Sequence, residues 1–168
     1  IANIAWMITV AIGSASTILV SHIWGAQNRT ALRPTIAATY HLGLIWATIM
    51  AAVFIFLRTP IASVFTDNSE VIALTSELML LIAIYQFSDA IQGLSISMLR
   101  GLQDVKIIMP IVLTSYLLIS IPAGAMLAYS FNLECQGLVI GLILGLSAAA
   151  LMTALRLRRQ MHAFERMN

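Results

Sequence analysis

VIALTSELMLLIAIYQFSDAIQGLSISM, residues 71–98, is apolar enough and long enough to cross a lipid bilayer as one helix. It carries a carboxylate, Asp89, well inside the span. A charge at that depth costs roughly 2.5–3.5 kcal/mol on insertion scales, so it usually faces protein or water and carries function. Tyr85 and Gln92 share its helical face. A phenol, a carboxylate and an amide on one face indicate a cation or proton site; a carboxylate held by neighbouring helices for packing alone is the alternative.

Composition places the whole chain in a membrane. Hydrophobic residues make up 60% of the 168 residues, charged residues 10%, and the mean hydropathy is +0.94. A soluble domain has about 25% charged residues. The 9 basic and 7 acidic side chains of this chain are too few to cover a soluble surface.

Five apolar stretches are long enough, or nearly so, to span a bilayer. They are residues 1–24, 35–57, 71–98, 107–131 and 138–155, the last being the shortest. A segment in lipid must close its own backbone hydrogen bonds, and no alternating strand pattern competes. The sequence therefore predicts an all-α, polytopic membrane helix bundle with five transmembrane helices.

Charge between the spans predicts their orientation. Eight of the nine Lys and Arg residues follow the first, third or fifth span: Arg29, Arg33, Arg100, Lys106, Arg156, Arg158, Arg159 and Arg166. The opposite side has Arg58 beside Asp67, Glu70 and Glu134. By the positive-inside rule, the loops at 25–34 and 99–106 and a basic tail at 156–168 are cytoplasmic, and the N-terminus is external.

The chain begins with Ile1, already inside an apolar stretch, without the basic region and cleavage site of a signal peptide. An external N-terminus with an odd number of spans predicts that upstream helices are missing. We therefore expect residues 1–168 to be part of the C-terminal transmembrane region of a longer membrane protein.

Two features predict close packing and a bend. Gly137, Gly141 and Gly145 recur every four residues, a stripe that lets helix backbones approach closely, and packing is favoured over substrate contact there. Pro122 lies inside the fourth span and should remove one backbone hydrogen bond and kink the helix. Such a bend serves gating or packing, and the sequence favours neither.

The remaining polar candidates are few. Glu77 lies about two turns into the third span, where snorkelling to the external interface is favoured over a place on an ion path. Cys135 is alone, the three histidines share no ligand spacing, and the motifs HExxH, GxSxG and the Walker loop are missing from the sequence. We expect no enzyme, no cofactor and no nucleic-acid partner.

Several motifs carry a family resemblance. They are Phe65-Thr66-Asp67-Asn68, Leu80 through Gln92, Met98-Leu99-Arg100-Gly101, Gly25-Ala26, Asp104, Pro110, Ser115-Tyr116, Ile121-Pro122 and Gly137-Leu138. Together they resemble the multidrug and toxic compound extrusion (MATE) family, and are most similar to its bacterial sodium-coupled drug-efflux branch. The resemblance covers essentially the whole chain, as helices eight to twelve of a twelve-helix transporter.

The resemblance implies a function and a site. Members have two six-helix lobes that expose a central cavity alternately to each side. The tenth helix supplies a Tyr and an Asp to a cation site, which correspond here to Tyr85 and Asp89. The partner glutamate comes from the seventh helix, outside this chain. The pattern departs at Leu19-Val20-Ser21, where members often have Arg-Val-Gly, so no arginine role is carried over there.

The expected activity is antiport of drugs and organic cations, driven by Na⁺ or H⁺, in the inner (plasma) membrane. Expected partners are membrane lipid, cationic drugs or dyes, and the missing N-terminal helices. Two alternatives remain. A lipid-linked oligosaccharide flippase of related fold would need basic residues at depth, which these spans lack. A membrane structural subunit without transport activity is the other.

Overall fold

The computed structural model describes residues 2–65, 68–130 and 134–166. Five helical segments are long and apolar enough to cross a membrane: Trp6–Gly25, Arg29–Phe56, Val71–Gly101, Ile108–Ala128 and Gln136–Phe164. The described residues contain no strand, so the predicted all-α class with five spans is confirmed. Thr66, Asp67 and the predicted span end at 131 lie outside the described residues, as do the side chains of Glu70, Glu134 and Cys135.

Eight helical elements follow one another along the chain. They are α1 (Ala2–Gly25), α2 (Arg29–Phe56), α3 (Arg58–Phe65), α4 (Ser69–Gly101), α5 (Ile108–Thr114), the π-helix η1 (Ser115–Ser120), α6 (Ile121–Ser130) and α7 (Glu134–Arg166). The elements α5, η1 and α6 follow without a break and form one span.

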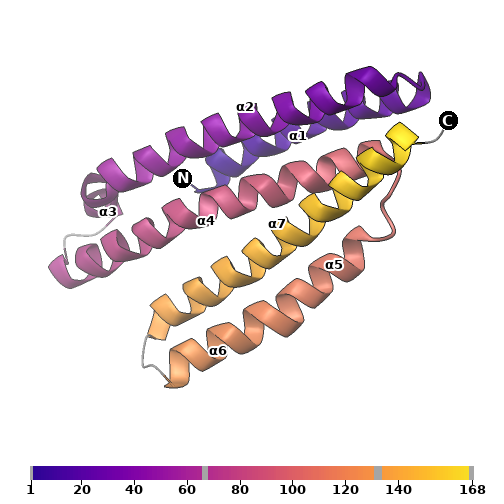
Figure 1. The fold of residues 1–168 in the computed structure, drawn as a ribbon. Coiled ribbons are helices and arrows are strands. Elements are labelled where there is room, and N and C mark those ends of the chain that lie inside the picture. The colour runs from indigo at the N-terminus through magenta and orange to yellow at the C-terminus, as the bar shows by residue number, and fades with distance from the viewer. Residues whose placement is uncertain (1, 66–67, 131–133, 167–168) are drawn as a thin grey trace.

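Helix α4 is the central element of the bundle (Figure 1). It packs against α1 and α2 on one side and against α7 on the other. The α5–η1–α6 span packs on α7, which separates it from α2. A polar side chain on α4 can therefore meet residues from several other spans.

Two helix boundaries differ from the predicted spans. The prediction that the fifth span is the shortest is wrong, because α7 runs from Glu134 to Arg166 as one helix of 33 residues. Its basic end stays helical because Leu157 and Phe164 are buried there against other helices. Helix α2 begins at Arg29, before the apolar stretch, and contains Pro34 at its sixth residue, in its second turn.

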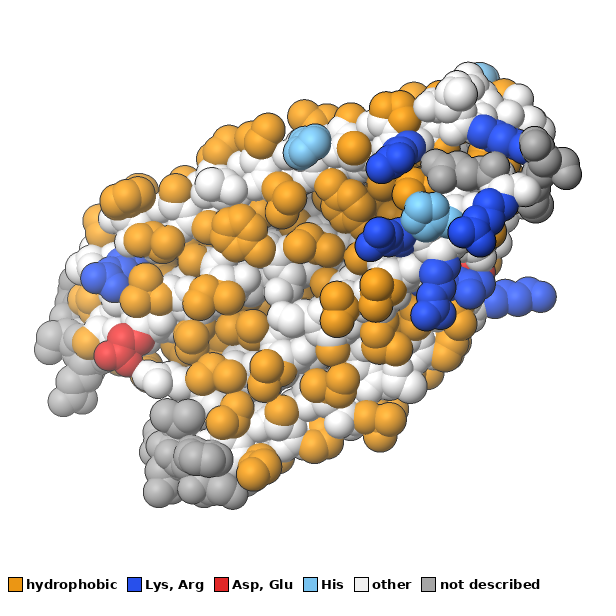
Figure 2. All heavy atoms as spheres, viewed as in Figure 1, with side chains coloured by type: hydrophobic (Ala, Val, Ile, Leu, Met, Phe, Trp, Pro, Cys, Tyr) orange, Lys and Arg blue, Asp and Glu red, His pale blue; other side chains and the backbone are white. Residues whose placement is uncertain are grey.

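Large apolar side chains cover the outside of the bundle. Phe56 is 81% exposed, Leu118 72% and Ile18 71%. An apolar surface of this extent would be unusual for a soluble monomer and fits contact with lipid and with other membrane helices. Figure 2 shows the hydrophobic side chains across the middle of one face, with most of its Lys and Arg gathered where α4 and α7 end. We call this end, residues 22–33, 100–108 and 156–166, the basic end.

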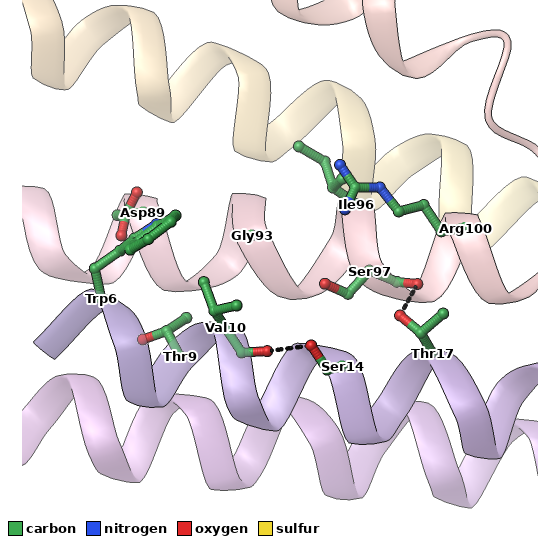
Figure 3. A pocket seen from close by; sticks show the side chains of 10 residues that line it. All are labelled: Trp6, Thr9, Val10, Ser14, Thr17, Asp89, Gly93, Ile96, Ser97 and Arg100. Carbon is green, nitrogen blue, oxygen red and sulfur yellow. Dashed lines mark hydrogen bonds between the residues drawn. The ribbon is translucent and has the colours of Figure 1, made fainter. Parts of the chain in front are cut away.

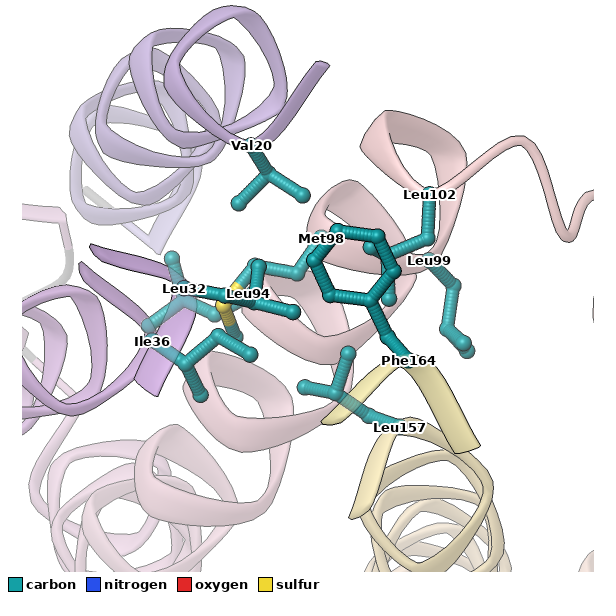
Figure 4. Packing of buried hydrophobic residues seen from close by; sticks show 9 residues of the cluster. All are labelled: Val20, Leu32, Ile36, Leu94, Met98, Leu99, Leu102, Leu157 and Phe164. Carbon is teal, nitrogen blue, oxygen red and sulfur yellow. The ribbon is translucent and has the colours of Figure 1, made fainter. Parts of the chain in front are cut away.

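A core of bulky side chains closes the basic end (Figure 4). Val20 of α1, Leu32 of α2, Met98 and Leu99 of α4 and Phe164 of α7 are each fully buried in it. The core therefore ties four helices together at one end of the bundle.

Candidate functional site

Asp89 lies on α4 at a cavity between α4 and α1. The cavity has a volume of about 200 Å³, and Trp6 and Thr9 of α1 line it opposite Asp89. Figure 3 shows the Asp89 carboxylate and the Trp6 indole at the same end of this cavity. Gly93, one turn after Asp89, also lines it. The predicted membrane carboxylate is thus partly buried at a hollow between helices.

Glycines bring α1 and α4 close together along this cavity. A Cβ added to Gly13 would lie 2.5 Å from Ser97 Oγ, and one added to Gly101 would lie 2.9 Å from the Thr17 carbonyl oxygen. The Thr17 hydroxyl donates to the Ser97 carbonyl oxygen across the same interface at 2.8 Å. Larger residues at either glycine would push the helices apart, so the cavity wall depends on them.

The cavity extends from Asp89 towards the basic end. Hydroxyl side chains at Ser14, Thr17 and Ser97 line it, and Arg100 lies at its far end. Arg100 follows Asp89 by eleven residues, about 16 Å along a helix. The two opposite charges therefore share a cavity without touching.

Two tyrosines and a glutamine lie in the neighbourhood of Asp89. Tyr85, one turn before it on α4, and Tyr116 of η1 both lie within electrostatic range of its carboxylate. The Gln92 side chain is buried and hydrogen-bonds with Tyr116. The amide on the predicted face of α4 is thus engaged by a tyrosine from another span.

Sequence reasoning assigned no role to Tyr116, because the residue lies 27 positions from Asp89 on a different span. The π-helix η1 carries it, and the Ile121 N–H donates to the Tyr116 carbonyl oxygen, five residues back. Pro122 follows at once and has no N–H to donate to the carbonyl of Leu118. In the sequence, Pro122 alone marks an irregular helix here; the π-turn, a feature that recurs at functional sites, is visible only in the structure.

Asp89 has no fixed countercharge among the residues that the structure describes. The salt bridge that these described residues do form joins Asp104 and Arg156, in the basic end. The described residues also contain no group of three or more His, Cys, Asp or Glu side chains arranged to hold a metal ion. One carboxylate with nearby phenol oxygens suits a proton or a monovalent cation better than a transition metal.

Glu77 lies apart from this cluster. It precedes Asp89 by twelve residues on the same uninterrupted helix, about 18 Å along the axis. Its carboxylate is exposed and accepts a hydrogen bond from the Gln136 side chain of α7 at 2.6 Å. The structure therefore does not bring Glu77 to Asp89.

The three predicted packing glycines meet a second row of small residues. A Cβ on Gly137 would lie 2.6 Å from the Ala128 nitrogen, and one on Gly141 or Gly145 would collide with Gly124 or Ser120. Small residues thus recur every four positions on both helices, at 120, 124 and 128 and at 137, 141 and 145. The close approach fixes the span that carries Tyr116 against α7.

A second aspartate lies just beyond α4, in the basic end. Asp104 accepts hydrogen bonds from Arg156 Nε and Gln160 Nε2 of α7, both at 2.7 Å. Its side chain is 16% exposed. The hydrogen bond from Arg156 holds the pKa of the Asp104 carboxyl below its usual value, against the opposing effect of burial.

Comparison with known sequences identifies the relatives. The family model MatE matches residues 1–126. Multidrug resistance protein MdtK of Edwardsiella ictaluri is 34% identical over 160 residues, 93% of this chain and 35% of that protein. Multidrug resistance protein NorM of Photobacterium profundum is 35% identical over 160 residues, with the same coverage of 93% and 35%. The chain thus spans about a third of the length of these relatives.

Solved structures share the fold. The crystal structure of the eukaryotic MATE transporter AtDTX14 superposes with a TM-score of 0.84 at 21% identity, over 95% of this chain and 37% of that one. A second structure, the inward-facing conformation of a multidrug resistance MATE family transporter of the MOP superfamily, gives 0.84 at 15% identity, over 98% and 40%. At these identities the likeness speaks for the arrangement of helices alone.

Proposed function

The chain belongs to the MatE family, and from this premise we propose that it forms part of an antiporter that exports drugs and organic cations in exchange for Na⁺ or H⁺. Relatives named as multidrug resistance proteins support the class of activity. The chain spans about a third of those proteins. We therefore assign the complete transport cycle to a longer protein in which these helices contribute the coupling site.

One observation carries the coupling role: Asp89 is a carboxylate inside a span, at a cavity, without a salt-bridge partner among the described residues. A permanent countercharge would make the residue structural. None is present among those residues, and a cation that binds and leaves would balance the charge. Tyr85 and Tyr116 both lie within electrostatic range of the carboxylate, and their phenol oxygens are the further ligands that we propose for the ion.

Neutralising this charge has enough free energy to move a conformational equilibrium. A charged side chain within a span costs roughly 2.5–3.5 kcal/mol, which corresponds to roughly a hundredfold change in a two-state ratio. Binding of a proton or Na⁺ to Asp89 removes that cost in the arrangement where the site is driest. The ion thereby favours one arrangement of the helices and its release favours the other.

The orientation follows from charge. We place the basic end in the cytoplasm and the protein in the inner membrane of a bacterium, with the C-terminal end of α7 on the cytoplasmic side. The clustering of Lys and Arg at one end of the bundle supports this placement (Figure 2). The hydroxyl-lined cavity between Asp89 and Arg100 then provides a route from the site towards the cytoplasm.

Substitution of Asp89 by Asn in the full-length protein tests this function. Asn keeps the shape and removes the charge, so membrane insertion should be unchanged. Cells that rely on this protein should lose nearly all resistance to a cationic dye. Full resistance in Asp89→Asn cells, at equal protein level, would show that another group couples the ion.

A second experiment tests the division of labour. The 168 residues alone should insert into proteoliposomes without exporting dye, because alternating access needs two bodies that move around a site. Export by this chain on its own would assign the complete activity to these five spans.

A further inference from the structure

A second hollow lies on the face of the bundle between α2 and α7, away from the Asp89 cavity. Its volume is about 360 Å³, and Ile36, Tyr40 and Leu44 of α2 line it with Ile91 of α4. Figure 1 shows α2 and α7 on either side of α4 on this face. Its lining comes from three helices, so the hollow is a groove in the wall of the bundle.

The groove is apolar along its length and cationic at one end. Helix α7 contributes Ala154, Leu157 and Met161, and Arg158 is the one charged residue among the described residues that line the groove. Arg158 is exposed and belongs to the basic end. The Tyr40 hydroxyl is already hydrogen-bonded to Ser95 at 2.7 Å, so it adds no unfilled polar group to the wall.

The dimensions fit one alkyl chain. Ile36 and Leu44 are eight residues apart, about 12 Å along α2, close to the half-thickness of a bilayer core of about 30 Å. The groove is thus long enough to hold most of one acyl chain of a single leaflet.

We propose that this groove binds an anionic phospholipid, with one acyl chain between α2 and α7 and its phosphate at Arg158. Apolar walls that end in a guanidinium match a lipid with an anionic headgroup, and basic pockets between membrane helices on the cytoplasmic side recognise such headgroups. A cationic drug would meet a like charge at Arg158. The site depends on the membrane placement of the five helices and not on the transport activity proposed above.

Photo-crosslinking in lipid nanodiscs tests the proposal on the full-length protein. The probe is phosphatidylglycerol with a diazirine on one acyl chain, compared with the same label on phosphatidylcholine. Peptides covering residues 36–44 and 154–161 should be labelled about fivefold more by the anionic lipid, the ratio expected for one cation near the headgroup. Arg158→Gln should reduce that preference to near one.

Two matched controls make the result specific. Arg159→Gln removes a neighbouring charge that does not line the groove and should keep the preference. Ala154→Phe narrows the groove and should abolish labelling, whereas Leu151→Phe, at an exposed residue one turn away, should not. If Arg158→Gln and Arg159→Gln lowered the preference for the anionic lipid equally, the preference would come from the general surface charge, and the proposed site would be wrong. The proposal would also be wrong if both lipids labelled the groove equally, or if Ala154→Phe left the labelling unchanged. It would be wrong as well if neither lipid labelled the groove because protein covers it.

Discussion

Two aspartates fifteen residues apart on and just beyond α4 are used in opposite ways. Asp104, after the helix ends, is held by Arg156 and Gln160 of α7 at 2.7 Å each. Asp89, inside the span, faces a cavity and has no salt-bridge partner among the described residues. The more costly position is the one without the fixed partner, which is the reverse of what stability alone would select.

The packing around the two aspartates differs in the same way. Around Asp104, the basic end is closed by a core of bulky side chains in which Trp24 and Phe164 stack with ring centroids 4.5 Å apart. Beside Asp89, α1 and α4 leave a hollow, and a Cβ added to Gly93 would have only Thr9 Cγ2 near it, at 3.9 Å. A closely packed end beside a hollow middle is consistent with the coupling role that we propose for Asp89.

The largest expected stability effect belongs to the basic end. Phe164→Ala should lower the free energy of unfolding by about 3 kcal/mol or more, because it leaves a cavity among fully buried side chains and removes the stack on Trp24. Thermal unfolding in detergent measures the loss. Phe56→Ala, at a residue 81% exposed, is the control and should change stability by less than about 0.5 kcal/mol. If Phe164→Ala and Phe56→Ala lowered the free energy of unfolding equally, the basic end would not be the more stable region.

Asp104→Asn should lower the free energy of unfolding by less, about 1–2 kcal/mol. It removes the charge from two hydrogen bonds, but Arg156 is already partly exposed, so water can solvate its guanidinium. Glu77→Gln, at an exposed carboxylate with a neutral partner, should change stability little. Transport per folded molecule should survive both substitutions. A transport loss in Asp104→Asn as deep as that in Asp89→Asn would break the comparison.

The pH dependence of the free energy of unfolding tests whether the charge of Asp104 is what stabilises the protein. Since the pKa of Asp104 is lowered in the folded protein, its stabilising effect is complete above the unfolded value of about 3.9. It is lost as the pH falls from there through the folded pKa. The difference in the free energy of unfolding between the wild type and Asp104→Asn should therefore shrink as the pH falls below about 4. A constant difference between the two proteins down to about pH 2 would show that the charge is not responsible.

A smaller effect separates the tyrosines. Tyr85→Phe keeps the ring and removes the oxygen near Asp89, so the Na⁺ or proton concentration for half-maximal efflux should shift severalfold, roughly 1 kcal/mol. Tyr40→Phe removes a hydroxyl that Ser95 already engages, and its midpoint should stay in place. A titration of efflux against pH at fixed Na⁺ measures both. An unchanged midpoint in Tyr85→Phe would leave its hydroxyl without a part in coupling.

The spans and Asp89 were predictable for one physical reason: hydrocarbon penalises charge and unpaired backbone so strongly that length and polarity decide the outcome. Features that depend on packing between distant segments were not. Tyr116 lies on the π-turn at 115–120, and its span is held in place by the approach of two rows of small residues. The sequence indicated only one of these rows, at Gly137, Gly141 and Gly145. The continuation of α7 to Arg166 and the short helix α3 were missed because neither region is apolar enough to mark a helix.

The most direct measurement of the account compares Asp89→Asn with Asp104→Asn in proteoliposomes of the full-length protein, loaded with a cationic dye and subjected to imposed Na⁺ or pH gradients. Both variants should insert, fold and contain the same amount of protein. We expect an inward-directed ion gradient to accelerate dye export in Asp104→Asn as in the wild type, and to leave Asp89→Asn at its rate without a gradient. A gradient response in Asp89→Asn equal to that of the wild type would contradict the claim that this carboxylate couples the ion to the drug.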